Sequence, residues 1–247
     1  MAKIGIVACQ ALARELAHIL NSNTKLETIY VVRSPEGVEF ASHLKGTRVR
    51  LIHDPAFVRR SSKGPEAIVS VLPIGLHLDI EELEYECNET VTYLKDMTKG
   101  IVLFYGLCGR GLENVICRDD VSLFYPMDEE GIADDCVCSL MGRKRYFEEL
   151  RRNGSFFITP GFALYRKQML EKVNSRSTQH YSNSETLVML EANDYKRGLV
   201  VHEGIESEED LSLEYLLSSE YNLPVEHTTG SLDMLEDALG RAIEACL

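Results

Sequence analysis

Short apolar runs alternate with amphipathic stretches along most of the chain. The run KIGIVAC, residues 3–9, is continuous and rich in β-branched residues, as expected for a strand that is buried on both faces of a parallel sheet. Residues 11–20 then repeat apolar side chains at helical spacing, which predicts an amphipathic helix. Cys9 is therefore predicted to lie where a buried strand ends and a helix follows.

The same alternation continues to the end of the chain and predicts an α/β fold. Further strands are predicted at residues 27–33, 48–53, 67–73, 101–106, 121–126, 196–204 and 223–230, and helical segments at 34–44, 76–97, 131–142, 143–152, 163–173, 184–192, 208–221 and 232–247. Strands and helices in this order predict a doubly wound, mostly parallel sheet or sheets with helices on both faces. We expect one domain, 1–247, or two interleaved Rossmann-like lobes, 1–126 and 127–247.

Length, composition and charge exclude several classes of protein. No apolar run in the 247 residues reaches the roughly 18 residues that span a bilayer, so we expect no membrane segment and a cytoplasmic location. The formal net charge is −13, and such a surface repels a polyanion. Nucleic acid is therefore not an expected partner.

The stretch FYGLCGRGLENV, residues 104–115, follows a predicted strand and contains Gly106, Gly109 and Gly111. It lacks the third glycine of G-x-G-x-x-G and the lysine of G-x-x-x-x-G-K-[ST], so neither nucleotide-binding motif is present. What remains is a loop free of Cβ atoms before a helix N-terminus, where an anion can bind or a ligand can approach the backbone. The alternative is a tight turn without a ligand.

Seven cysteines, an odd number, do not indicate a disulfide framework in a cytoplasmic chain. Cys9 and Cys108 each follow the carboxyl end of a predicted strand, which is where open α/β sheets bind ligands. Cys136 begins a predicted helical segment after two aspartates. If the three converge, they form a zinc site with one open position or hold a [4Fe-4S] cluster with one free iron. The alternative is that they only pack in the core.

Other candidate residues lie near these cysteines in the sequence. His77 and Asp135 are candidates for orienting a ligand or moving a proton, although a helix-entry histidine and a helix-capping aspartate explain them equally. Arg143 and Arg145 are candidates for binding an anionic group. The alternative for these two arginines is a solvated helix face.

Several of these motifs together resemble a known family. The segments FYGLCGRGL, DDC, SLMGRKRYFEEL and GSFFITPGF, in this order, are similar to DUF1638, a family of uncharacterised proteins. The resemblance implies cysteines equivalent to Cys9, Cys108 and Cys136. It also implies a link to one-carbon metabolism, because the genes of family members often lie beside those of corrinoid-dependent methylamine methyltransferases.

Two functions from different classes are therefore expected. The first is a metal-binding protein in which Cys9, Cys108 and Cys136 hold Zn²⁺, or alternatively a [4Fe-4S] cluster, and activate a thiol or methyl group. Its expected ligand is a small-molecule thiol or an anion. Its expected protein partner is a second copy of the chain, in a homodimer. The second is a non-catalytic accessory protein for a corrinoid protein or methyltransferase. The chain has no D-x-H-x-x-G segment, so direct corrinoid ligation of the usual kind is not expected.

Overall fold

The computed structural model describes residues 3–46, 48–58, 64–152, 154–176, 195–208, 211–212, 215, 219 and 223–246. The predicted helix at 184–192 lies outside the described residues, and so does most of the predicted helix at 208–221.

Six parallel strands form the larger sheet, in the order β3-β2-β4-β1-β5-β6. Their bounds are β1 (Lys3–Cys9), β2 (Thr28–Val32), β3 (Val49–Ile52), β4 (Glu66–Leu72), β5 (Gly100–Phe104) and β6 (Leu123–Phe124). Every residue of β1 and β5 is buried, which explains why both read as continuous apolar runs. The carboxyl ends of all six strands lie at one edge because the strands are parallel.

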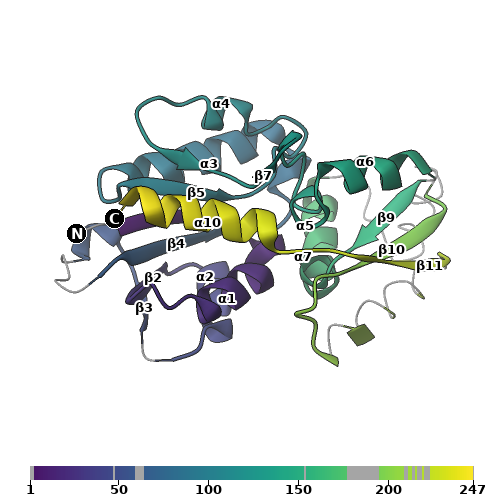
Figure 1. The fold of residues 1–247 in the computed structure, drawn as a ribbon, viewed down its shortest axis with the longest axis horizontal. Coiled ribbons are helices and arrows are strands. Elements are labelled where there is room, and N and C mark those ends of the chain that lie inside the picture. The colour runs from purple at the N-terminus through teal and green to yellow at the C-terminus, as the bar shows by residue number, and fades with distance from the viewer. Residues whose placement is uncertain are drawn as a thin grey trace.

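Helices cover both faces of this sheet (Figure 1). The first face packs on α1 (Ala13–Ser22), α2 (Pro35–His43) and α10 (Asp233–Cys246), and the opposite face packs on α3 (Ile80–Lys95) and α4 (Glu113–Ile116). Short 3-10 helices, η1 (Gln10–Leu12), η2 (Pro55–Phe57) and η3 (Leu76–Leu78), lie in the connecting loops. The predicted doubly wound α/β architecture is confirmed.

A second, smaller sheet contains three parallel strands in the order β11-β10-β9. The bounds in this region are β9 (Ser155–Ile158), β10 (Arg197–His202), β11 (Val225–Thr229), the helices α5 (Cys138–Met141), α6 (Arg143–Arg152) and α7 (Pro160–Arg176), and the hairpin strands β7 (Met127–Asp128) and β8 (Gly131–Ile132). The buried guanidinium of Arg197 joins three elements by bonding Glu149, Glu226 and Ser155.

The C-terminal helix connects the two sheets. After β11 the chain returns to the larger sheet, where α10 packs against β1, β5 and β6 (Figure 1, yellow). Leu235, Leu239 and Ile243 of this helix are buried in the same core cluster as α1. A division of the chain at residue 126 would therefore separate α10 from the sheet that it covers.

Most predicted elements match those of the structure, with two local differences. The predicted strand at 121–126 is reduced to β6, and the predicted helical segment at 131–142 starts with β8 and is helical only over α5. Between β8 and α5 the backbone forms hydrogen bonds with another segment, since the carbonyl oxygens of Ala133 and Asp134 accept from N–H groups of the loop after β5. A carbonyl with a distant partner is not available to a helix.

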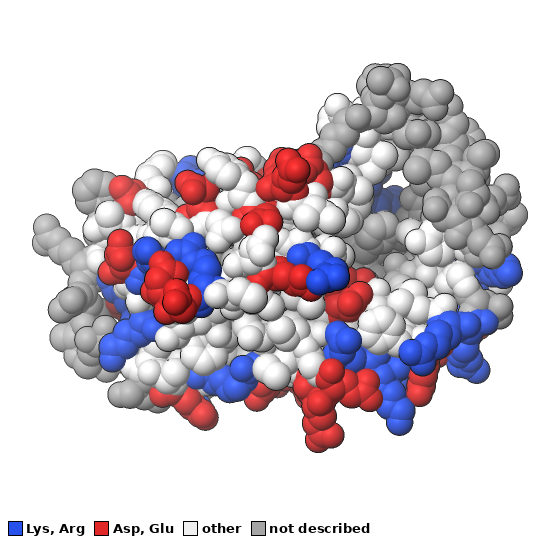
Figure 2. Space-filling model, turned by 90° about the horizontal axis from the view of Figure 1, so that it is seen from above, with Lys and Arg blue, Asp and Glu red and all other residues white. Residues whose placement is uncertain are grey.

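Acidic and basic side chains are mixed over the face of the molecule seen in Figure 2. That face therefore shows no broad basic surface of the kind that binds a polyanion. Among the described residues, none of the helices has the length and apolar character needed to cross a membrane.

Candidate functional site

Three neighbouring strands bring Cys9, His77 and Cys108 to one edge of the larger sheet. β1 lies between β4 and β5, with Cys9 beside Leu72 and Ala8 beside Phe104. The chain leaves β4 into η3, which carries His77, and leaves β5 into the loop with Cys108. Residues 99 positions apart in the sequence, Cys9 and Cys108, thus meet because their strands are parallel neighbours.

Cys136 reaches the same edge although no strand of the larger sheet carries it. The backbone N–H of Leu107 donates to Ala133 (2.9 Å), and that of Cys108 donates to Asp134 (2.8 Å). These two bonds hold the segment before Cys136 against the loop after β5. The predicted convergence of the three residues is therefore produced by pairing between two loops.

The thiol of Cys136 lies in hydrogen-bonding contact with those of Cys9 and Cys108. The thiols of Cys108 and Cys9 stabilise the thiolate of Cys136 and lower its pKa well below the ordinary value, and the backbone N–H of Gly106 contributes further. The same contacts, followed by burial, raise the pKa of Cys9 and of Cys108. One negative charge is thus concentrated on Cys136 and shared with two protonated neighbours.

The three thiols do not form a ready metal-binding group in this structure. Within the described part of the chain, no group of three or more His, Cys, Asp or Glu side chains is arranged so that it could hold a metal ion. The cysteines outside the cluster are also free; Cys87, Cys138 and Cys246 are buried and Cys117 is exposed.

A cavity of about 470 Å³ opens between the two sheets, with the three cysteines at one end. His77, Gly109 and Asp135 line the same end. Aromatic residues from α6, β9, α7 and the segment before β10 also line it, namely Tyr146, Phe156, Phe157, Phe162 and Tyr195. The cavity therefore combines a reactive, sulfur-lined end with an apolar end, as small-molecule sites usually do.

His77 faces the cavity from η3. His77 is exposed to solvent, but nearby protein atoms partly desolvate its ring and lower its pKa, and the negative charge of Cys136 opposes that shift. The ring is therefore mainly neutral near pH 7, and a neutral imidazole can accept a proton.

Asp135 lines the cavity, but both of its carboxylate oxygens are engaged. One oxygen accepts from the backbone N–H of Cys138 (2.7 Å) and the other accepts from the hydroxyl of Tyr146. Burial raises the pKa of Asp135 to about 6. Asp135 thus fixes the start of α5. It also fixes Cys136, which directly follows Asp135 in the sequence.

The three glycines of the loop have different roles. A Cβ at Gly106 would overlap the backbone of Asp135, and a Cβ at Gly111 would crowd Leu83 and Ile80 of α3. Gly109, with a φ of +66° and open space around it, lines the cavity. Ligand approach therefore stays a prediction for Gly109, whereas Gly106 and Gly111 serve close packing.

Cys108 itself has a left-handed backbone, with a φ of 49°. Arg110 has a φ of 75°, so three consecutive residues, 108–110, lie in the region that favours glycine. Non-glycine residues there cost on the order of 1 kcal/mol, and such strain is concentrated at functional sites. The loop accepts this cost while presenting the Cys108 thiol to Cys136.

Arg143 and Arg145 lie outside the cavity lining. The guanidinium of Arg143 donates to the carbonyl of Ile132, and that of Arg145 donates to the carbonyl of Thr229. These contacts link α6 to β8 and to the end of β11. Anion binding by the two arginines stays a prediction that this geometry does not support.

Two tyrosines at the site carried no recognisable signal in the sequence. Tyr105 is buried just after β5, and its hydroxyl finds no nitrogen or oxygen partner among the described residues but lies against the Cys9 thiol. Tyr146 bonds Asp135 and stacks on Phe157. Tyr105 lies two residues before Leu107 of the glycine loop, and this closeness is the one feature of the sequence that points to it.

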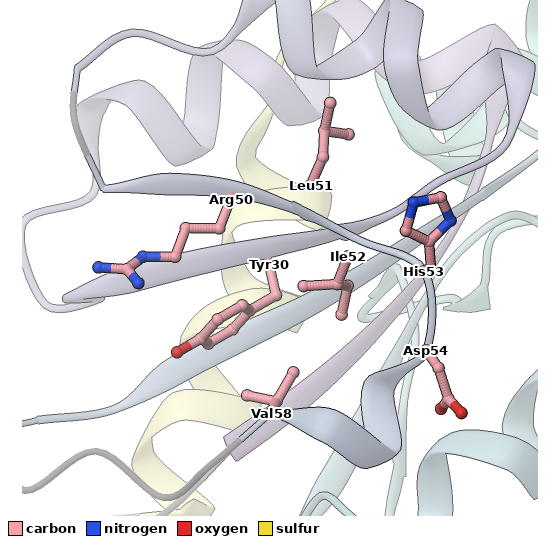
Figure 3. Close-up of a pocket in the computed structure, with 7 residues that line it drawn as sticks. All are labelled: Tyr30, Arg50, Leu51, Ile52, His53, Asp54 and Val58. Atoms are coloured by element: carbon pink, nitrogen blue, oxygen red, sulfur yellow. The ribbon is translucent and has the colours of Figure 1, made fainter.

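Another cavity, of about 500 Å³, lies at the outer edge of the larger sheet and does not share these features (Figure 3). Arg50 and Tyr30 point to one end of it, whereas His53 and Asp54 lie at the other. The hydroxyl of Tyr30 donates to Glu66 (3.2 Å), which is a bond between neighbouring strands. Its polar groups do not converge, so the cysteine-lined cavity is the better candidate site.

Comparison with known proteins identifies the family of the chain. A family model described as "Protein of unknown function (DUF1638)" matches residues 71–239. The matched range contains His77, Cys108 and Cys136, whereas Cys9 precedes it. No curated protein and no solved structure matches the chain.

Proposed function

The chain belongs to the DUF1638 family, and we propose that it binds a metal ion through Cys9, Cys108 and Cys136 at the sulfur-lined end of the cavity. Zinc is the first choice, and a [4Fe-4S] cluster with one open iron is the alternative. The fourth ligand would be a small molecule in the cavity. The observation that carries this proposal is the contact of Cys136 with Cys9, at the end of β1, and with Cys108, in the loop after β5, in the lining of one cavity.

The donor set suits a soft metal ion. Thiolates are preferred ligands of zinc and of iron–sulfur clusters, and three protein ligands leave a position for substrate. All three cysteines line the cavity; Cys108 and Cys136 are partly exposed and Cys9 is buried. Metal binding requires that the protonated thiols lose their protons and that the side chains rearrange around the ion.

A neighbouring group supports this assignment. The hydroxyl of Tyr105, which has no nitrogen or oxygen partner among the described residues, lies against Cys9. A metal-bound thiolate accepts such a hydrogen bond, and groups outside the ligand shell commonly tune metal sites in this way. The buried hydroxyl of Tyr105 therefore has an acceptor when Cys9 is a thiolate.

The residues around the cysteines would act on the bound ligand. Zinc held by the three thiolates would supply Lewis acidity that keeps an incoming thiol deprotonated. His77, whose pKa is lowered by desolvation, would accept the proton of that thiol. Asp135 accepts from the Tyr146 hydroxyl and from the backbone N–H at the start of α5, and these two bonds fix the backbone next to Cys136. Gly109 leaves room beside the ligand.

Metal quantification on protein purified without oxygen tests the proposal. We expect about one zinc per wild-type chain, or absorption near 400 nm if a cluster is bound. Cys9→Ser, Cys108→Ser and Cys136→Ser should each lose most of the metal. Cys117→Ser is the matched control, because Cys117 is an exposed cysteine outside the cavity lining, and it should keep the wild-type content.

Two outcomes would contradict the metal site. One is a metal content in Cys108→Ser and Cys136→Ser equal to that of Cys117→Ser. The other is a wild-type chain that binds no zinc or iron even after reconstitution. Co-purification with a corrinoid protein or methyltransferase, without stoichiometric metal, would instead favour the accessory role.

A metal-free function is the second candidate, because the Cys136 thiolate is already stabilised without an ion. In that case Cys136 is a nucleophile: its sulfur forms a bond to an alkyl carbon while the leaving group departs with the electron pair. Mass-spectrometric mapping after brief iodoacetamide treatment should then find Cys136 labelled before the exposed Cys117. Preferential labelling of Cys117 would contradict this candidate.

A further inference from the structure

Packed aromatic rings form a second part of the cavity lining beside the cysteines. The ring of Phe156 meets Phe162 and Tyr195 edge to face, with centroids 5.4 and 5.5 Å apart. In a second group, Tyr146 stacks on Phe157 at 5.3 Å. Tyr146, Phe156, Phe157 and Phe162 come from α6, β9 and α7, whereas Tyr195 lies two residues before β10, so regular elements anchor all of these rings except Tyr195. Such a lining favours a ligand that offers its own ring edge or face.

The charges around the cavity disfavour an ionic ligand tail. No lysine or arginine is among the described residues that line it. At its sulfur-lined end the ionisable side chains are the three thiols, Asp135 and His77, and the thiols and Asp135 can carry only negative charge or none. An anionic tail buried there would lose hydration without gaining a partner.

From these two observations we infer that the cavity binds an uncharged thiol with an aromatic body, with its sulfur at the cysteines and its ring between the two aromatic groups. This inference rests on the proposed function, because the metal site is what selects the sulfur. The volume of about 470 Å³ lies in the range of sites for drug-sized ligands, so it admits a body larger than a single ring. The anionic ligand predicted from Arg143 and Arg145 is thereby replaced by a neutral one.

A tryptophan reporter can test this inference, because the chain contains no tryptophan. Phe162→Trp places a single indole in the cavity lining and conserves an aromatic ring. The zinc-loaded variant is titrated with 4-methylbenzenethiol and, for comparison, with 4-methylphenol, cyclohexanethiol and 4-mercaptobenzoate. Calorimetry on the wild-type chain provides a measurement that is independent of the new residue.

We expect 4-methylbenzenethiol to bind at least about tenfold more tightly than each of the other three probes. The phenol lacks the sulfur, cyclohexanethiol lacks the aromatic ring, and mercaptobenzoate adds a negative charge. In Cys136→Ser, the preference for the thiol over the phenol should disappear, while weak binding of both rings remains. Leu150→Trp, which enlarges another lining residue, should weaken binding of all ring-bearing probes without changing the metal content.

The failure of this inference and the failure of the proposed function give different results. Equal or tighter binding of 4-mercaptobenzoate or cyclohexanethiol by the zinc-loaded protein would overturn the inferred ligand class and leave the metal site intact. Absence of metal from the wild-type chain would overturn the proposed function. If the metal is present and no probe binds, the inferred ligand is also wrong.

Discussion

Gly106 packs so closely on Asp135 that a Cβ atom at residue 106 would overlap the Asp135 backbone. The contact joins the loop after β5 to the segment that delivers Cys136. It lies beside the two backbone hydrogen bonds from Leu107 and Cys108 to the same segment. The position of the Cys136 sulfur therefore depends on the absence of a side chain thirty residues earlier in the sequence.

Gly106→Ala should lower the free energy of unfolding by about 1–3 kcal/mol and disturb the thiol cluster, because backbone atoms must move to admit the methyl group. Chemical denaturation measures the first effect, and metal content measures the second. Gly240→Ala is the control: residue 240 lies in α10 with open space around it, so alanine should be neutral or should stabilise by up to about 1 kcal/mol. Full metal binding by Gly106→Ala would contradict the role given to this contact.

Tyr105→Phe should weaken metal binding about tenfold or more while changing stability by less than about 1.5 kcal/mol. The hydroxyl lies against the Cys9 thiol, so its loss removes a donor to a ligand, whereas no nitrogen or oxygen of the described residues loses a partner. Competition with a chelator measures the affinity. Tyr85→Phe, at an exposed position of α3, should leave the affinity unchanged. Equal metal affinities of Tyr105→Phe and Tyr85→Phe would show that the Tyr105 hydroxyl does not contribute to metal binding.

Glu15→Gln should change how stability depends on pH. The carboxyl of Glu15 is fully buried on α1 near that of Glu203, with Arg14 and Cys136 as the other charged neighbours, and burial raises its pKa from 4.5 to about 7. The folded chain therefore holds a proton that the unfolded chain has already released above pH 4.5. Wild-type stability should fall by on the order of 3 kcal/mol as the pH rises from about 4.5 to about 7.

The glutamine variant lacks this titration, so its free energy of unfolding should change less across the same range and exceed that of the wild type at pH 8. Urea denaturation at pH 5 and at pH 8 measures the difference. Glu244→Gln, at an exposed position of α10, is the control and should follow the wild-type pH profile. Identical profiles for Glu15→Gln and wild type would show that Glu15 does not carry the proton.

Arg197→Gln should destabilise the chain by about 3 kcal/mol, because it leaves the partly buried carboxylate of Glu149 without its main partner. Arg152→Gln is a matched control, since Arg152 pairs with the same Glu149 but is mostly exposed. That exposed pair should contribute less than about 1 kcal/mol. Similar losses for the two variants, measured by denaturation, would contradict the structural role of Arg197 in the smaller sheet.

Local patterns predicted the elements closely wherever the backbone bonds within one element. The strand at 3–9 has the predicted bounds, and the helix predicted at 34–44 is α2, which Ser34 caps by accepting from the N–H of Gly37. The helix predicted at 131–142 was wrong over 131–137, because the carbonyl groups of Ala133 and Asp134 accept from the loop after β5. The spacing of apolar residues reflects only the hydrogen bonds within a helix or between adjacent strands of a sheet.

The amino-acid sequence by itself determined that Cys9 and Cys108 follow buried strands, since continuous apolar runs specify strands buried on both faces and parallel strands end at one edge. Only the tertiary structure decided that these strands are neighbours, that Cys136 joins them and that α10 returns to the larger sheet. It also decided that the two arginines bond to carbonyl groups outside the cavity lining. Such contacts join segments far apart in the chain, and they depend on how whole elements pack, which no short stretch of residues encodes.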